Sequence, residues 1–109
     1  MAFEALDVTH AFLAALAEVV AQIARRDPDL ARQLRRAGSS IALNLAEGRQ
    51  RAGRDQLHLY RISAGSAAEV TAALDVALAW HHVTPAQRAA LDATLDRVRA
   101  MTFRLTHPR

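Results

Sequence analysis

TPAQ, at residues 84–87, is the segment that most clearly indicates the fold, because it predicts the start of a helix. Thr84 suits the N-cap position, Pro85 stands at the first helical position, and Gln87 is placed to complete a capping box. Apolar residues then recur at helical spacing until Pro108, at Leu91, Leu95, Val98 and Leu105. We therefore predict a helix that begins at Pro85 and ends before Pro108.

A similar start signal stands earlier, in RDPDL at residues 26–30. Asp27 is a suitable N-cap, and Pro28 occupies the first helical position, where its missing N–H costs nothing. This helix should end at Gly48, in the position of a C′ glycine. Its apolar stripe consists of Leu30, Leu34, Ala37, Ile41 and Leu45.

Two further helices complete the pattern. The first ends near Arg25 and has a stripe with a period near 3.5, formed by Leu6, Leu13, Leu16, Val20 and Ile23. The other begins between Gly53 and Asp55, where an acid favours the helix dipole, and runs to about Trp80. Since no segment alternates with the period of a strand, we predict an all-α fold. The expected architecture is an antiparallel up-and-down four-helix bundle, as a single domain over residues 1–109.

The helix over residues 53–80 has two apolar faces. One face consists of Leu57, Tyr60, Ala64, Ala67, Leu74 and Leu78, and the other of Leu59, Ile62, Val70, Ala73 and Ala77. The second face must pack on the other flanking helix or on another subunit. We favour a subunit contact through Leu59, Ile62, Val70 and Ala73. Gly65, in mid-helix, costs about 1 kcal/mol relative to alanine, so we expect it to permit a close backbone approach.

Positive charge is concentrated in one block of the chain. The net charge is +3, yet residues 25–61 hold nine arginines against four acids. Arg32, Arg35 and Arg36 lie on the outer face of the second helix, and Arg49, Arg51 and Arg54 lie in the corner loop NLAEGRQRAGR (44–54). We expect the six to form a basic patch that binds nucleic-acid phosphates with weak sequence selectivity. A solvated loop and helix surface is the alternative interpretation, and a GC-rich genome also explains why every basic residue is arginine.

Composition narrows the class of protein. The chain has no cysteine, which excludes disulfides and thiolate metal sites and favours a cytoplasmic location. The N-terminus MAFEALDVTH carries acids where a signal peptide has basic residues, and the apolar stretch from Val70 to Ala79 is broken by Asp75. We therefore expect a soluble protein with no membrane partner.

Candidate catalytic and metal-binding residues are few. His81 and His82 adjoin Trp80 at a turn, and neighbouring side chains point apart, which makes them a poor chelate. The five aromatic residues are too dispersed for a base-stacking platform. We predict no catalytic residues, no metal site and no cofactor, and hence a protein that is not an enzyme.

Two segments resemble a known family. QLRRAGSSIALNLAEG (33–48) and LYRISAGSAAEV (59–70) are similar to paired motifs of the bacterial 23S rRNA intervening-sequence proteins. By motif, the first block matches at Ser40, Ile41, Asn44, Ala46, Glu47 and Gly48, and the second at Gly65, Ser66 and Glu69. Asn44 should hydrogen-bond toward the next helix or cap carbonyls near the turn, and Glu47 should pair with an arginine. Family members often have proline where this chain has Ala42, and a serine where it has the Ala52-Gly53 turn.

The resemblance implies a four-helix bundle that assembles into a homopentamer without known catalytic activity. Some relatives are encoded within intervening sequences of ribosomal RNA genes. More distant relatives are accessory proteins of diversity-generating retroelements, in which a basic pentamer contacts nucleic acid and a reverse transcriptase. Our leading hypothesis is a homo-oligomer that binds RNA or DNA through its arginines. The alternative is a protein-interaction scaffold or accessory protein, for example for a reverse transcriptase, with no direct nucleic-acid role.

Overall fold

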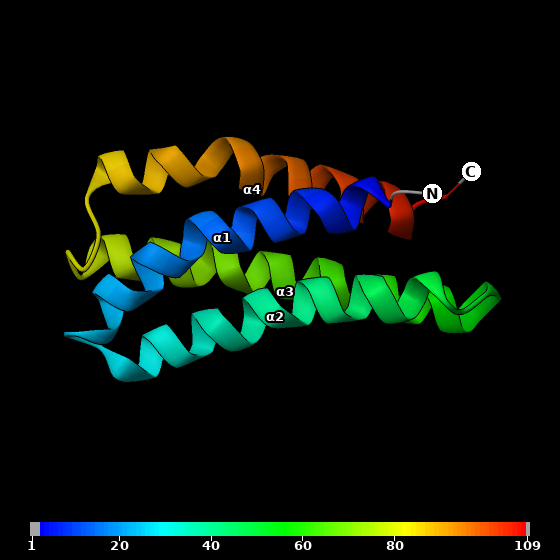
Figure 1. Ribbon diagram of the computed structural model, residues 1–109, viewed down its shortest axis with the longest axis horizontal. Coiled ribbons are helices and arrows are strands. Elements are labelled where there is room, and N and C mark those ends of the chain that lie inside the picture. Colours follow the sequence, from blue (N-terminus) through cyan, green and yellow to red (C-terminus); the bar gives the residue numbers. More distant parts are fainter. Residues whose placement is uncertain (1–2, 109) are drawn as a thin grey trace.

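The computed structural model describes residues 3–108 of the chain, and nearly all of them lie in α-helices. The helices are α1 (Glu4–Ala24), α2 (Pro28–Arg49), α3 (Gly53–Ala79) and α4 (Pro85–Thr106). Figure 1 shows the chain running along the length of the molecule four times, with its turns alternating between the two ends. No strand occurs within residues 3–108. The prediction of an all-α fold with four helices is confirmed.

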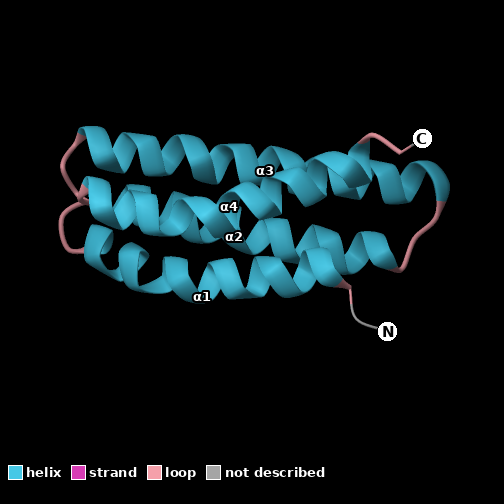
Figure 2. Ribbon diagram, turned by 90° about the horizontal axis from the view of Figure 1, so that it is seen from above, coloured by secondary structure: helices cyan, strands magenta, loops and turns pink. Residues whose placement is uncertain are grey.

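The N-terminal caps form as the sequence predicts. The Asp27 carboxylate accepts a hydrogen bond from the backbone N–H of Leu30 at 3.1 Å. The Thr84 hydroxyl accepts from the N–H of Gln87 at 3.1 Å, while the Gln87 side-chain oxygen accepts from the N–H of Thr84 at 2.9 Å. These side chains satisfy donors that the first turn of a helix leaves unpaired. The loops between the helices are short (Figure 2).

Two glycines differ from prediction. Gly48 is not a C′ residue, because α2 continues to Arg49; it is buried, and a Cβ there would lie 2.7 Å from Cε1 of Tyr60. At Gly65, in contrast, a Cβ would have no neighbouring atom of the described residues within 4 Å, so the prediction of a close approach at Gly65 is wrong. At the turn between α2 and α3, the residue that adopts a left-handed backbone conformation is Gly53, whose φ is 60°.

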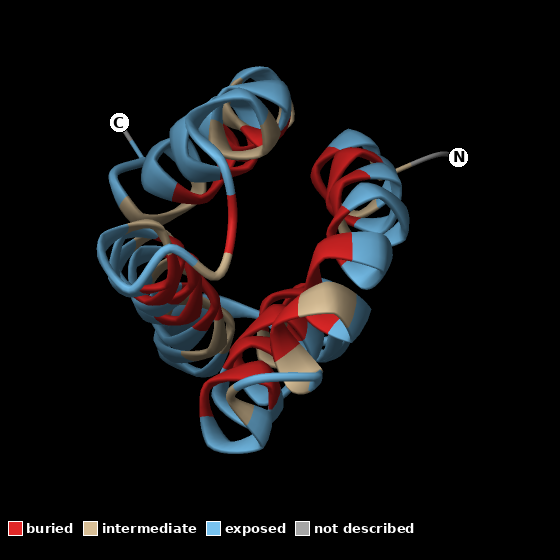
Figure 3. Cartoon of the chain, turned by 90° about the vertical axis from the view of Figure 1, so that its left-hand side faces the viewer, coloured by how far each residue is buried: buried red, intermediate tan, exposed pale blue. Residues whose placement is uncertain are grey.

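Each helix packs against two neighbours: α1 and α3 both contact α2 and α4. The molecule measures 42 × 23 × 22 Å, and its buried residues line the inward faces of all four helices (Figure 3). Phe12, Leu34, Leu74 and Leu95 are among the largest fully buried side chains, one from each helix. The stripes predicted from the sequence therefore meet in one core, with Leu6, Leu13 and Leu105 half-buried at its margin.

The two apolar faces of α3 are explained within the chain. Because α3 packs against both α2 and α4, Val70 and Ala77 are fully buried and Ala73 is 8% exposed. The prediction that Val70 and Ala73 contact a second subunit is therefore wrong, since neither side chain is available at the surface. Leu59 is half-buried against Gly48, and Ile62 alone of the predicted contact residues is exposed, at 38%.

Helices α1 and α3 are each long and apolar enough, by length and composition alone, to cross a membrane. Helices that line a bundle core have the same length and composition, so this property does not distinguish the two kinds of helix. In this bundle 39% of the most apolar window of each helix is buried against the other helices.

Candidate functional site

The α2–α3 turn carries Arg49, Arg51 and Arg54 at one end of the bundle. The Gln56 side chain shapes this turn, because its amide donates to the carbonyl of Gly48 at 3.1 Å and to that of Arg51 at 3.0 Å. Glu47 forms an ion pair with Arg51 at 3.1 Å, as the sequence predicts for this acid. The turn is thus a hydrogen-bonded corner that fixes where the backbone presents its arginines.

The three arginines have different surroundings. The Arg49 guanidinium lies over the Phe3 ring, 5.3 Å from its centroid, and Phe3 in turn packs against Tyr60 with ring centroids 6.3 Å apart. Burial raises the pKa of the Tyr60 hydroxyl above its ordinary value, and the positive charge of Arg49 opposes part of that rise. Arg54 is exposed, and no carboxylate in the described part of the chain lies within ion-pair distance of it.

A fourth arginine lies at the same end. Arg104, in the last turn of α4, lines one surface pocket with Gly53 and Gln56 and another with Phe3 and Glu4. Arg104 was not among the residues predicted from the sequence. Its position could have been predicted, because in an up-and-down bundle the C-terminal end of the fourth helix lies at the same end as the loop between the second and third helices. We call the group Arg49, Arg51, Arg54 and Arg104 the basic end.

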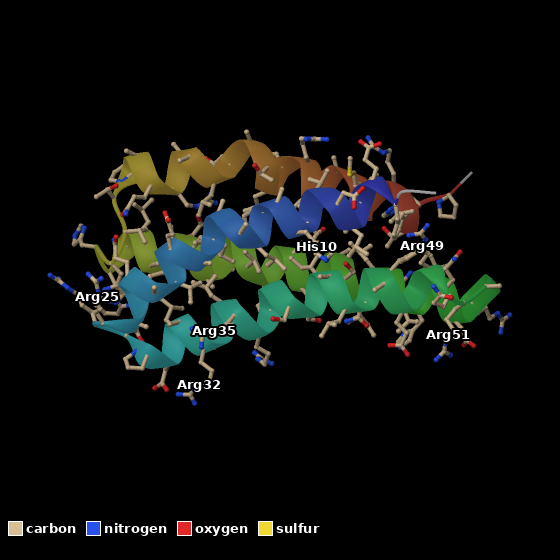
Figure 4. The ribbon with its side chains drawn as sticks, in the orientation of Figure 1. His10, Arg25, Arg32, Arg35, Arg49 and Arg51 are labelled. Carbon is tan, nitrogen blue, oxygen red and sulfur yellow. The ribbon has the colours of Figure 1, made fainter. Side chains whose placement is uncertain are left out.

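The other three predicted arginines lie elsewhere, so the six do not form one patch. Figure 4 shows Arg32 and Arg35 in the other half of the molecule from Arg49 and Arg51. From Arg35 to Arg49 the helix rises about 21 Å, because the two are separated by nearly four turns of α2. Arg32 pairs with Asp29 at 2.5 Å, and Arg35 lies at the rim of a groove between α1 and α2. Helical spacing predicts their outer face correctly but gives no reason to join them to the corner loop.

The remaining arginine of the six belongs to the seam between α2 and α3. Arg36 pairs with Glu69 at 3.0 Å, which connects the two helices. One side of the same seam carries the serines of both motif blocks: the hydroxyls of Ser40 and Ser66 are 2.7 Å apart, and the amide of Asn44 donates to the Ser40 carbonyl at 2.9 Å and to its hydroxyl at 3.0 Å. The motif residues thus hold α2 against α3, and Asn44 bonds within α2 instead of reaching the next helix.

Apolar side chains are exposed along this seam. Leu43 is 68% exposed and lies one turn along α2 from Ser40, while Ile62 lies one turn along α3 from Ser66. We define the outer α2–α3 face by Arg36, Ser40, Leu43, Asn44, Ile62, Ser66 and Glu69. The exposure of Leu43 was not predicted from the sequence. It could have been, because Leu43 lies outside the apolar stripe of its helix.

The turns at the opposite end form a structural network. His82 lies 3.3 Å from the Asp27 carboxylate, and the Gln22 amide donates to the His82 carbonyl at 2.9 Å. His81 has a φ of 61°, which places it in the left-handed region of the turn. Within residues 3–108 no group of three acidic, histidine or cysteine side chains is close enough to hold a metal ion.

Comparisons with known proteins agree with this fold. The family model described as 23S rRNA-intervening sequence protein matches residues 3–104. A crystal structure from Bacteroides thetaiotaomicron, described as a protein with unknown function from the S23 ribosomal protein family, superposes with a TM-score of 0.86. The two chains are 17% identical, and the match covers 95% of this chain and 99% of the other. A comparison with curated proteins finds no significant match.

Proposed function

Because this chain belongs to the 23S rRNA-intervening sequence protein family, we propose that it is a non-enzymatic bundle that binds RNA or DNA through its basic end. The observation that carries the proposal is the gathering of Arg49, Arg51, Arg54 and Arg104 at one end of the molecule, around the α2–α3 turn. Guanidinium groups bind phosphates in a planar, bidentate fashion, so the basic end suits the backbone of a nucleic acid. Binding of this kind is weakly sequence-selective and strongly salt-dependent.

The proposal includes assembly of an antiparallel, single-domain bundle into a homo-oligomer, which the family resemblance suggests is a pentamer in the bacterial cytoplasm. The exposed Leu43 and Ile62 support self-association, because large apolar side chains at the surface favour contact with another surface. A ring of subunits would present several basic ends together. Several weak phosphate contacts would then act jointly on one nucleic acid.

Charge reversal tests the basic end. Arg49→Glu, Arg51→Glu and Arg54→Glu, introduced together, should abolish retention of the protein on immobilised RNA or DNA at low salt. Reversing Arg25, Arg26 and Arg32 at the opposite end changes the net charge equally and serves as the matched control. Retention that survives the first triple substitution, or that both triples abolish equally, would reject the basic end as the binding site.

A protein-interaction scaffold is the second candidate function, and the 68% exposure of Leu43 favours it. In that case the outer α2–α3 face binds a different protein, such as a reverse transcriptase, and nucleic acid plays no direct part. Leu43→Asp distinguishes the two candidates. Under the leading proposal it lowers the mass of the particle, whereas for the scaffold it leaves the mass unchanged and removes only the partner.

A further inference from the structure

The side of the bundle formed by α3 and α4 carries an exposed aromatic pair near the basic end. Phe103 is 58% exposed, and the His107 ring stacks on it with centroids 3.9 Å apart and an interplanar angle of 18°. We propose that this Phe103–His107 platform binds an unpaired base, so that the ligand of the basic end is a single-stranded nucleic acid. The sequence prediction that no base-stacking platform forms counted only phenylalanine, tyrosine and tryptophan, and so left out the His107 ring that stacks on Phe103. The inference rests on the proposed function and specifies its substrate class.

The platform is held in place before any ligand binds. Nδ1 of His107 lies 2.9 Å from the carbonyl oxygen of Phe103 and 3.0 Å from the Thr106 hydroxyl. Because a carbonyl oxygen only accepts, Nδ1 carries the hydrogen in this contact, which fixes the ring's orientation. The Thr106 hydroxyl donates to the same carbonyl at 2.9 Å. A stacked pair that is already ordered loses little conformational freedom when a base joins it.

Space for a ligand lies next to the two rings. Phe103 and His107 line a shallow pocket of about 210 Å³ between α3 and α4, together with Ala64 and Arg99. Ala64 is small and only half-buried, so the α3 side of the pocket is not filled by a large side chain. The opening is therefore bordered by flat aromatic surface on the α4 side and by little side-chain bulk on the α3 side.

Positive charge lies along α4 on both sides of Phe103. Arg99, one turn earlier, lines the pocket itself, and Arg104 follows Phe103 directly and lies beside the α2–α3 turn. A strand whose base stacks at Phe103 would thus meet guanidinium groups on either side of that base. This pairing of aromatic faces with arginines is how proteins hold single strands without reading their sequence. In a duplex both faces of each base are already stacked, so the platform offers a duplex nothing.

Affinity for matched probes tests the inference. We expect Phe103→Ala to weaken binding of a short oligothymidylate by about 5- to 150-fold, the range that corresponds to removal of one base-stacking ring. Binding of a duplex of equal length should stay unchanged. Trp80→Ala is the matched control, because Trp80 is 68% exposed at the opposite end of the bundle and should not alter either affinity.

A fluorescence signal reports the stacking directly. Trp80 is the only tryptophan in the chain, so Trp80→Phe with Phe103→Trp places the sole tryptophan on the platform. Oligothymidylate should quench its emission at the concentrations at which it binds. Binding without quenching would show that no base stacks on Phe103 and would overturn the inference. So would a Phe103→Ala variant that keeps full affinity while Arg51→Gln with Arg54→Gln abolishes it, a result that leaves nucleic-acid binding by the basic end intact. If the native protein binds neither probe, the proposed function itself fails.

Discussion

Replacing Gly48 by alanine is expected to destabilise the bundle, whereas the same replacement at Gly65 is expected to stabilise it. Both residues lie within helices, where alanine is favoured over glycine by about 0.5–1 kcal/mol. At Gly65 nothing in the described part of the chain lies within 4 Å of an added Cβ, so only this favourable effect operates. At Gly48 the Cβ would lie 2.7 Å and 2.9 Å from two Tyr60 ring carbons and 3.3 Å from Cβ of Leu59.

The steric cost at Gly48 should exceed the favourable effect of alanine. Tyr60 is only 6% exposed, so its ring has little room to move, and overpacking a buried site costs about 1–3 kcal/mol. Subtracting the favourable effect from the steric cost leaves a net destabilisation at Gly48 of up to about 2.5 kcal/mol. Since each kcal/mol moves the Tm of a domain of this size by about 4–8 °C, the Tm should fall by up to about 20 °C. Gly65→Ala should raise it by about 2–8 °C by the same conversion.

Thermal unfolding of the two variants, followed by circular dichroism, measures both shifts in the same protein. A double-mutant cycle isolates the clash, because Gly48→Ala should cost less in a Tyr60→Ala background, where the clashing ring is absent. A Gly48→Ala variant that is as stable as Gly65→Ala would refute the reasoning. It would mean that the α2–α3 seam relaxes around an extra methyl group at no cost.

Three further predictions concern the surface, a cap and a titrating group. Ile62→Asp should leave the helical circular dichroism intact and lower the particle mass in light scattering, whereas Val70→Asp should unfold the chain because it buries an unpaired carboxylate. Thr84→Ala should lower the free energy of unfolding in urea by about 0.5–2 kcal/mol, and an unchanged midpoint would show that the capping box contributes nothing. Because burial raises the pKa of Tyr60, its neutral form is favoured in the folded state, and stability should fall as pH rises above 10. Tyr60→Phe should remove that alkaline destabilisation, and tyrosinate absorbance reports this one residue because it is the only tyrosine.

Local signals in the sequence predicted the helices well. Asp27, Thr84 and Gln87 act through hydrogen bonds to residues three positions away, so their role can be read without knowing the tertiary structure. The helix starts at Pro28 and Pro85 follow directly from these caps. Apolar periodicity likewise identified the core stripe of α2, whose five predicted residues are all buried.

Contacts between helices were harder to predict. Periodicity shows that α3 has two apolar faces, but it does not say which neighbour covers each face, and Val70 and Ala73 were therefore assigned to another subunit. The glycines failed for the same reason: the need for Gly48 arises from Tyr60, twelve residues away on α3, and Gly65 faces open space. Arg32, Arg35 and Arg49 share a helix and a charge, and only the length of that helix separates Arg49 from the other two.

The salt dependence of nucleic-acid affinity tests the central claim, that the basic end holds phosphates, most directly. For the native protein, the logarithm of the association constant should fall linearly with the logarithm of salt concentration. Replacing Arg51, Arg54 and Arg104 by glutamine should make that slope shallower by about 0.9 for each duplex phosphate that the protein no longer neutralises, or about 0.7 on a single strand. Glutamine at Arg25, Arg26 and Arg32 should leave it unchanged. An equal slope in the native protein and the basic-end variant would contradict the account.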